Sequence, residues 1–139
     1  MKKFFAGLFG KKEPQTAAPG GDAVGQLRCY LDANLPKSYV TSKKYSVSIT
    51  EQSGTYAVRI TLDMLADGSD YSNFGPEDYF TFPELEGGYV LGLISKPPLP
   101  ISSYTLEMLF HSDTVVVEAG AGLDAGTITY RGESRKVTF

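Results

Sequence analysis

The chain has 139 residues, with 13 Lys and Arg against 16 Asp and Glu, and is long enough for one domain with a hydrophobic core. A single cysteine excludes an internal disulfide and so gives no sign of an oxidising compartment. The net charge of −3 is unevenly spread: residues 1–12 carry four Lys and no acid, whereas residues 13–139 carry nine Lys and Arg against sixteen acids. Nucleic-acid binding depends on neutralising phosphates, so no nucleic-acid partner is expected for this acidic body.

The first twelve residues, MKKFFAGLFGKK, form a basic amphipathic tail. Apolar side chains at helical spacing between lysines are typical of an interfacial anchor on anionic lipid. A docking peptide for a protein partner and a frayed terminus are the alternatives. The apolar run is too short for a transmembrane segment, and its flanks do not match a secretory signal peptide. The residues expected to contact a membrane or a partner are Phe4, Phe5, Leu8, Phe9, Lys2, Lys3, Lys11 and Lys12.

Residues 13–21, EPQTAAPGG, are a flexible linker by composition. The following stretch, residues 22–35, predicts a helix with Asp22 as its N-cap and Pro36 as its end. Its apolar residues fall on one stripe, which suits a helix that covers one face of a sheet. That stripe consists of Val24, Leu27, Leu31 and Leu35.

Residues 43–63 predict a β-hairpin. Tyr45, Val47 and Ile49 alternate with Ser and Thr, and the same alternation resumes from Tyr56 to Asp63. Between the two runs lies Gly54, which adopts positive φ at low cost and allows a short turn. One apolar face and one polar face are typical of an antiparallel sheet with one solvated side.

Residues 60–95 contain seven acids and no Lys or Arg. Aromatic residues are interleaved with these acids, and Gly, Asn and Pro predict a loop over residues 64–78. Since loops on a rigid scaffold often carry binding residues, this loop is the candidate ligand face, for a cation, a sugar or a basic peptide. The alternative is a solvated loop that its aromatic residues anchor to the core. The candidate ligand face consists of Asp67, Asp70, Tyr71, Phe74, Glu77, Asp78 and Tyr79.

Several later segments read as strands. The apolar run at residues 89–94 predicts a central strand, and residues 79–83 predict a short strand broken by its proline. Further strands are predicted at residues 104–110, 114–118, 127–130 and 135–139. Residues 22–139 therefore predict a single α+β domain: an N-terminal helix packed on an antiparallel, meandering sheet of about six to eight strands. The alternative is a small β-sandwich or partly open barrel with a peripheral helix.

No catalytic motif is present in the sequence. Its single histidine, His111, has no GxSxG partner, and the acid spacing does not match an EF-hand, so no metal or cofactor is predicted. We expect a small, non-catalytic binding or scaffolding module in the cytoplasm. If the tail acts as an anchor, the protein lies peripherally at the inner face of a membrane. The alternatives are a subunit of a larger assembly that pairs through strand edges and a hydrolase that uses carboxylates alone. The sequence does not indicate an oligomeric state.

Overall fold

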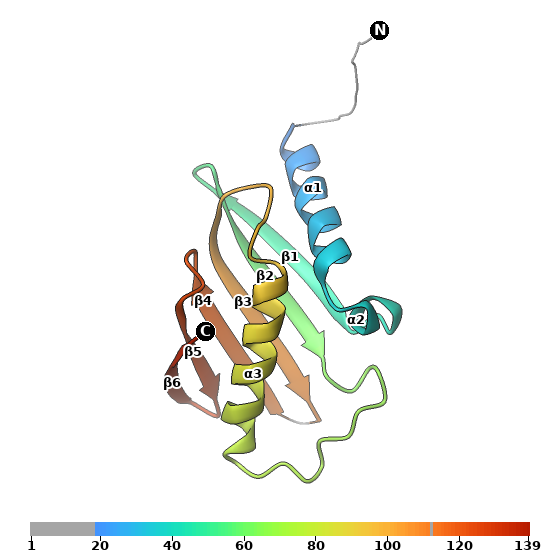
Figure 1. The fold of residues 1–139 in the computed structure, drawn as a ribbon, viewed down its shortest axis with the longest axis vertical. Coiled ribbons are helices and arrows are strands. Elements are labelled where there is room, and N and C mark those ends of the chain that lie inside the picture. Colours follow the sequence, from blue (N-terminus) through green and yellow to red (C-terminus); the bar gives the residue numbers. More distant parts are fainter. Residues whose placement is uncertain (1–18, 112) are drawn as a thin grey trace, which may run out of the picture.

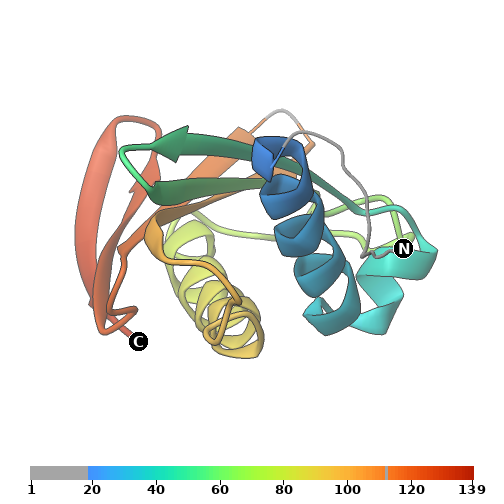
Figure 2. The same cartoon turned by 90° about the horizontal axis from the view of Figure 1, so that it is seen from above.

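The computed structural model describes residues 19–139 except residue 112, so the tail at residues 1–12 and most of the expected linker lie outside the described residues. The described chain forms one open sheet, with its helices on one face (Figures 1 and 2). The helices are α1 (Pro19–Asn34), α2 (Lys37–Thr41) and α3 (Asp78–Leu93). The strands are β1 (Tyr45–Gln52), β2 (Thr55–Asp63), β3 (Ile101–Phe110), β4 (Asp113–Gly120), β5 (Ala125–Tyr130) and β6 (Glu133–Thr138).

The six strands lie in chain order across the sheet, from β1 at one edge to β6 at the other. Every neighbouring pair is antiparallel except β2 and β3, which are parallel. Two adjacent parallel strands need a crossover connection, and the segment that contains α3 supplies it. The α+β class is therefore confirmed with a mostly antiparallel sheet, whereas the expectation of an entirely antiparallel meander is wrong at this one pair.

The predicted hairpin is present as β1 and β2, with Tyr45 opposite Leu62 and Gln52 opposite Thr55. Ser53 and Gly54 form its two-residue turn, and both have positive φ, 53° and 84°. Turns with two positive φ angles match the twist of the strands that they connect. The local sequence therefore fixes both the turn and the register.

The strands predicted at residues 79–83 and 89–94 are wrong, because residues 79–83 and 89–93 belong to the single helix α3, with Ile94 as its C-cap. Its buried residues recur at the three- and four-residue spacing of one helical face, which the interpretation as two strands overlooked. Gly87 lies where this face approaches β4, since a Cβ atom there would be 3.3 Å from Val117 Cγ1. The residues of α3 that are buried are Tyr79, Phe80, Pro83, Gly87, Val90 and Leu91.

The core lies between the sheet and the two long helices. Leu27 and Leu31 of α1 are fully buried against it. The predicted helix is present, but α1 begins at Pro19, so Asp22 is not its N-cap and residues 19–21 are helical and not part of a linker. α1 and α3 run in opposite directions over the same face of the sheet (Figure 1). The other face carries short polar side chains such as Ser48, Thr105 and Thr127, and it is solvated. This is one layer of helices on one open sheet.

Candidate functional site

The aromatic residues of the candidate ligand face turn inward. Phe74 has its ring centroid 5.1 Å from that of Tyr71 and 5.3 Å from that of Tyr79. Tyr71 in turn lies edge-on to Phe110 of β3 at 4.9 Å, and Tyr79 stacks on Tyr130 of β5 at 4.5 Å. Such ring geometries are favourable and anchor the loop to the core. Burial raises the pKa of the Tyr79 and Tyr71 hydroxyls, in keeping with this packed position.

Two of the acids of this face, Asp67 and Asp70, bind groups close to their own loop. Asp67 accepts hydrogen bonds from the main-chain N–H and the hydroxyl of Ser69, and its Oδ2 lies 3.1 Å from Lys44 Nζ. The Ser69 hydroxyl, followed by Lys44, lowers the pKa of Asp67 to about 2. Asp70 accepts from the main-chain N–H of Ser72 at 2.9 Å, which is the main reason why its pKa is lowered. Each carboxylate is thus occupied by a different local donor.

The two remaining acids, Glu77 and Asp78, also point to separate partners. Glu77 forms an ion pair with Arg135 of β6, and this partner lowers the Glu77 pKa. Asp78 accepts from the main-chain N–H of Gly75 at 2.8 Å. Among the residues that the structure describes, no three His, Cys, Asp or Glu side chains converge on a position that could hold a metal ion. The structure therefore brings the aromatic residues of the face together and leaves its acids apart.

The exposed apolar surface of α3 is a feature that the sequence analysis missed. Leu85 is 71% exposed, Tyr89 is 58% exposed and Leu93 is 36% exposed. These three residues are four apart in a helix, so they form one row, on the side of α3 opposite its buried face. We call this row the α3 stripe. Its i, i+4, i+8 spacing is visible in the sequence, but the interpretation of residues 89–94 as a strand hid it.

The charged side chains that α3 itself carries are all acidic, and Arg135 and Lys136 of β6 line a hollow with one of them, Glu84. α3 carries Asp78, Glu84 and Glu86 and contains no Lys or Arg. Glu86 is half-buried, and burial raises its pKa, because a desolvated carboxylate is less stable when charged. Gly92 lies beside the stripe, and a Cβ atom there would meet nothing within 4 Å. The stripe is therefore an open apolar row with negative charge along it.

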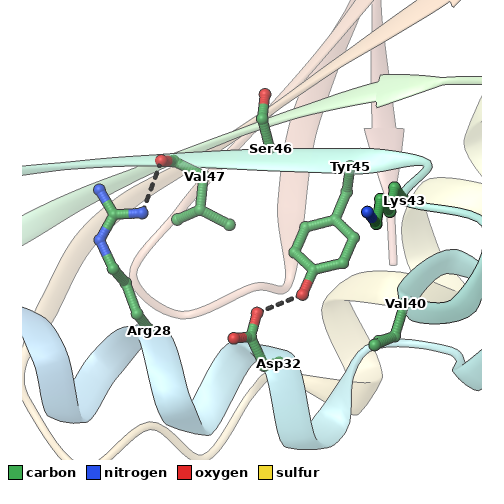
Figure 3. Close-up of a pocket in the computed structure, with 7 residues that line it drawn as sticks. All are labelled: Arg28, Asp32, Val40, Lys43, Tyr45, Ser46 and Val47. Atoms are coloured by element: carbon green, nitrogen blue, oxygen red, sulfur yellow. Dashed lines mark hydrogen bonds between the residues drawn. The ribbon is translucent and has the colours of Figure 1, made fainter.

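A hollow of about 440 Å³ lies between α1 and the edge strand β1 (Figure 3). Arg28 of α1 donates from Nη1 to the main-chain carbonyl of Val47 at 3.0 Å, and Tyr45 donates from its hydroxyl to Asp32. Burial, followed by the hydrogen bond to Asp32, raises the pKa of Tyr45 to about 12. Both bonds join the helix to the outermost strand, and Arg28 occupies an edge carbonyl that would otherwise be open to another strand. The hollow is lined by Arg28, Asp32, Val40, Lys43, Tyr45, Ser46 and Val47.

The fold and its surfaces thus define a small α+β protein with one open sheet and an exposed apolar row on its crossover helix. Comparison of the chain with family models, with curated proteins and with solved structures finds no match. Within residues 19–139, residue 112 excepted, no helix combines the length and the apolarity that a membrane crossing requires.

Proposed function

We propose that this protein is a small, non-catalytic binding module whose docking face is the α3 stripe. The observation that carries this proposal is the exposure of Leu85, Tyr89 and Leu93 in one row. Exposed apolar side chains scattered singly are ordinary on a protein surface, whereas a continuous row with a polar rim is typical of an interaction site. An amphipathic helix that packs its apolar face against such a row uses residues at the same four-residue spacing.

The charge around the stripe selects the kind of partner. None of the ion pairs between described residues includes Glu86. The helix that carries Glu86, α3, contains no basic residue. A basic segment would supply the missing positive charge, whereas an acidic segment would be repelled. The partner that fits is therefore an apolar, basic helical segment.

The basic tail supplies a second contact in this proposal. Its apolar residues and lysines are suited to an anionic membrane surface, which would place the protein peripherally at the inner, cytoplasmic face of a membrane. The acidic body would then face away from the lipid. Sedimentation with anionic vesicles tests this contact: replacement of Phe4, Phe5, Leu8 and Phe9 by serine is expected to release the full-length chain, and equal sedimentation of both proteins would exclude the anchor.

The other two functions have less support. Pairing through strand edges is opposed at β1, because Arg28 already binds the outward carbonyl of Val47. A carboxylate-only hydrolase needs two carboxyl groups on either side of one bond. The carboxylates of the candidate ligand face are instead each held by a different partner, such as Lys44 for Asp67 and Arg135 for Glu77.

Fluorescence anisotropy with a labelled amphipathic peptide of Leu and Lys tests the docking face. The protein is the full-length chain with Phe4→Ser, Phe5→Ser, Leu8→Ser and Phe9→Ser, here called the tail-serine variant, so that its own tail does not compete. We expect this variant to bind the peptide and to lose about tenfold or more in affinity after Leu85→Ser and Tyr89→Ser, because two exposed apolar anchors are removed.

Two controls accompany this measurement. Leu109 is 36% exposed on β3, away from α3, so Leu109→Ser in the tail-serine variant should leave the affinity unchanged. A peptide with Glu in place of Lys should bind more weakly, because the rim of the stripe is acidic. Equal binding of the Lys peptide before and after Leu85→Ser and Tyr89→Ser would refute the docking face.

A further inference from the structure

We propose that the α3 stripe has a ligand within the same molecule: the basic tail, residues 1–12, docks on Leu85, Tyr89 and Leu93 when no partner is bound. This inference rests on the proposed function in one respect: both use the α3 stripe as the binding surface. The tail would then have two alternative positions, on its own α3 or on an external surface.

The length of the chain allows this contact. The Tyr30 hydroxyl of α1 accepts a hydrogen bond of 2.9 Å from the main-chain N–H of Lys96, which lies three residues beyond α3. Pro19, at the start of α1, is therefore about 17 Å along the helix from a point next to the end of the α3 stripe. The chain from Phe9 to Pro19 reaches about 33–36 Å when extended, so it covers this path with length to spare.

The apolar residues of the tail match the stripe in spacing. Phe4 and Leu8 are four residues apart, as are Phe5 and Phe9, and the members of the α3 stripe repeat at the same interval. Rows of residues at i and i+4 are the ridges that interlock when two helices pack. Gly92 is exposed beside the stripe and has open space around it, which permits close approach of a second helix.

The charges of the two segments are opposite. The tail carries Lys2, Lys3, Lys11 and Lys12 and no acid, whereas α3 carries three acids and no base. These lysines flank the apolar residues on both sides, so apolar contact with the stripe brings them towards acids such as Glu86 and Asp78. Opposite charges arranged in this way favour one partner and reject others. The body of the chain is thus complementary to its own tail in both apolar pattern and charge.

This arrangement makes external binding a competition. A ligand on the same chain acts at a high effective concentration, so an external partner must displace the tail before it occupies the stripe. Conversely, an anionic membrane that captures the tail would expose Leu85, Tyr89 and Leu93. Membrane contact and partner binding would therefore reinforce each other, because each removes the same internal contact.

Paramagnetic broadening in NMR spectra tests the internal contact directly. A nitroxide label is attached at residue 6 of the full-length, ¹⁵N-labelled chain through Ala6→Cys, with Cys29→Ser removing the exposed native thiol. We expect the amide signals of Tyr89, Gly92 and Leu93 to lose intensity relative to the sample with reduced label. The amides of Thr105 and Thr127, which lie in the plane of the sheet and further from the outer side of α3, should lose less intensity.

Two further samples separate the possible outcomes. Replacement of Lys2, Lys3, Lys11 and Lys12 by Glu should abolish the broadening of α3, because like charges then oppose the contact. A mixture of spin-labelled chain without ¹⁵N and ¹⁵N-labelled chain without the nitroxide reports contacts between molecules. If the α3 signals are broadened as strongly in that mixture as in the singly prepared sample, the tail docks between copies, which would overturn the internal contact. Absence of broadening in the sample that carries both labels on one chain would overturn it as well.

The peptide measurement distinguishes failure of this inference from failure of the proposed function. If the tail docks internally, the wild-type chain should bind the Leu and Lys peptide about threefold or more weakly than the tail-serine variant does. Equal affinity of the two chains would overturn internal docking and leave the stripe as a docking face. Loss of peptide binding by the tail-serine variant itself would instead remove the proposed function.

Discussion

Lys44 Nζ lies 3.1 Å from Asp67 Oδ2, and this contact fastens the loop after β2 to the start of β1. The Lys44 side chain is only 3% exposed, and its ammonium group also lies 4.6 Å from the centre of the Tyr39 ring. The main chain supports the same junction, since the Lys44 carbonyl accepts from the N–H of Asp63 at 2.7 Å. Burial of an ammonium group costs free energy unless the group is paired, so Asp67 stabilises the folded state by pairing with Lys44.

Asp67→Ala is expected to lower the free energy of unfolding by about 1–3 kcal/mol at pH 7, because it leaves Lys44 buried without its carboxylate. Adding Lys44→Met to this variant should recover most of the loss, since an apolar side chain of similar length needs no partner. Urea unfolding followed by circular dichroism measures both changes. A double variant no more stable than Asp67→Ala would contradict this account of the pair.

Titration of Asp67 should make the free energy of unfolding depend on pH. Its pKa is lowered from 3.8 to about 2, so the folded state favours the charged carboxylate, and the stability gained is present above pH 4 and lost as the pH falls towards 2. Urea midpoints of the wild type and Asp67→Ala, measured from pH 6 to pH 2, should therefore converge at the acid end. The other carboxyl groups contribute equally to both proteins, and a constant difference over this range would exclude the expected linkage.

Phe74 is expected to be a structural residue of the loop. Its ring lies within 6 Å of the ring centres of Tyr71, Tyr79, Phe82 and Phe110. Phe74→Ala should therefore cost about 2–4 kcal/mol in the free energy of unfolding, a little less than for a fully buried phenylalanine. Tyr89→Ala, which removes an exposed ring from α3, is the matched control and should cost much less. Equal losses from the two variants would show that Phe74 does not anchor the loop.

The elements that the sequence predicted well are those whose patterns are local. The alternation from Tyr45 to Asp63 and the turn at Gly54 specify the hairpin without help from the rest of the chain. α3 was missed because its C-terminal part belongs to the apolar run at residues 89–94, which fits a buried strand as well as a helix. The helix is recognised only from the spacing of the buried residues over the whole segment from Tyr79 to Leu91. The parallel pairing of β2 with β3 depends in turn on this helix, because it lies in the crossover connection.

The candidate ligand face shows the same limit. Composition located acids and aromatic residues in one segment, but it did not indicate which side chains would point outward. Tyr71 and Phe74 both reach the ring of Phe110 on β3, and Glu77 reaches Arg135, which is 58 residues away in the chain. Such contacts between remote segments are set by the tertiary fold, so local composition does not distinguish an anchoring loop from a binding loop.

Gly126 of β5 is expected to tolerate no larger residue. A Cβ atom there would lie 2.8 Å from Phe139 Cε2 and closer still to the main-chain carbonyl oxygen of Glu118. Because the main chain of β4 moves only with its whole strand, Gly126→Ala should cost about 1–3 kcal/mol or more. Gly120→Ala is the matched control, since a Cβ atom at Gly120 meets nothing within 4 Å. Thermal unfolding of the two variants compares them, and similar midpoints would contradict the predicted clash.

Leu85 and Leu91, six residues apart on α3, should differ sharply in how much their substitution changes stability. Leu91 is 1% exposed and Leu85 is 71% exposed, so Leu91→Ala is expected to cost about 2–5 kcal/mol in the free energy of unfolding. Leu85→Ser should change it by no more than about 0.5 kcal/mol, because the side chain contributes little to the core. Urea unfolding measures both values. If Leu85→Ser were as destabilising as Leu91→Ala, the α3 stripe would be part of the core, and it would not be free to bind either the tail or a partner.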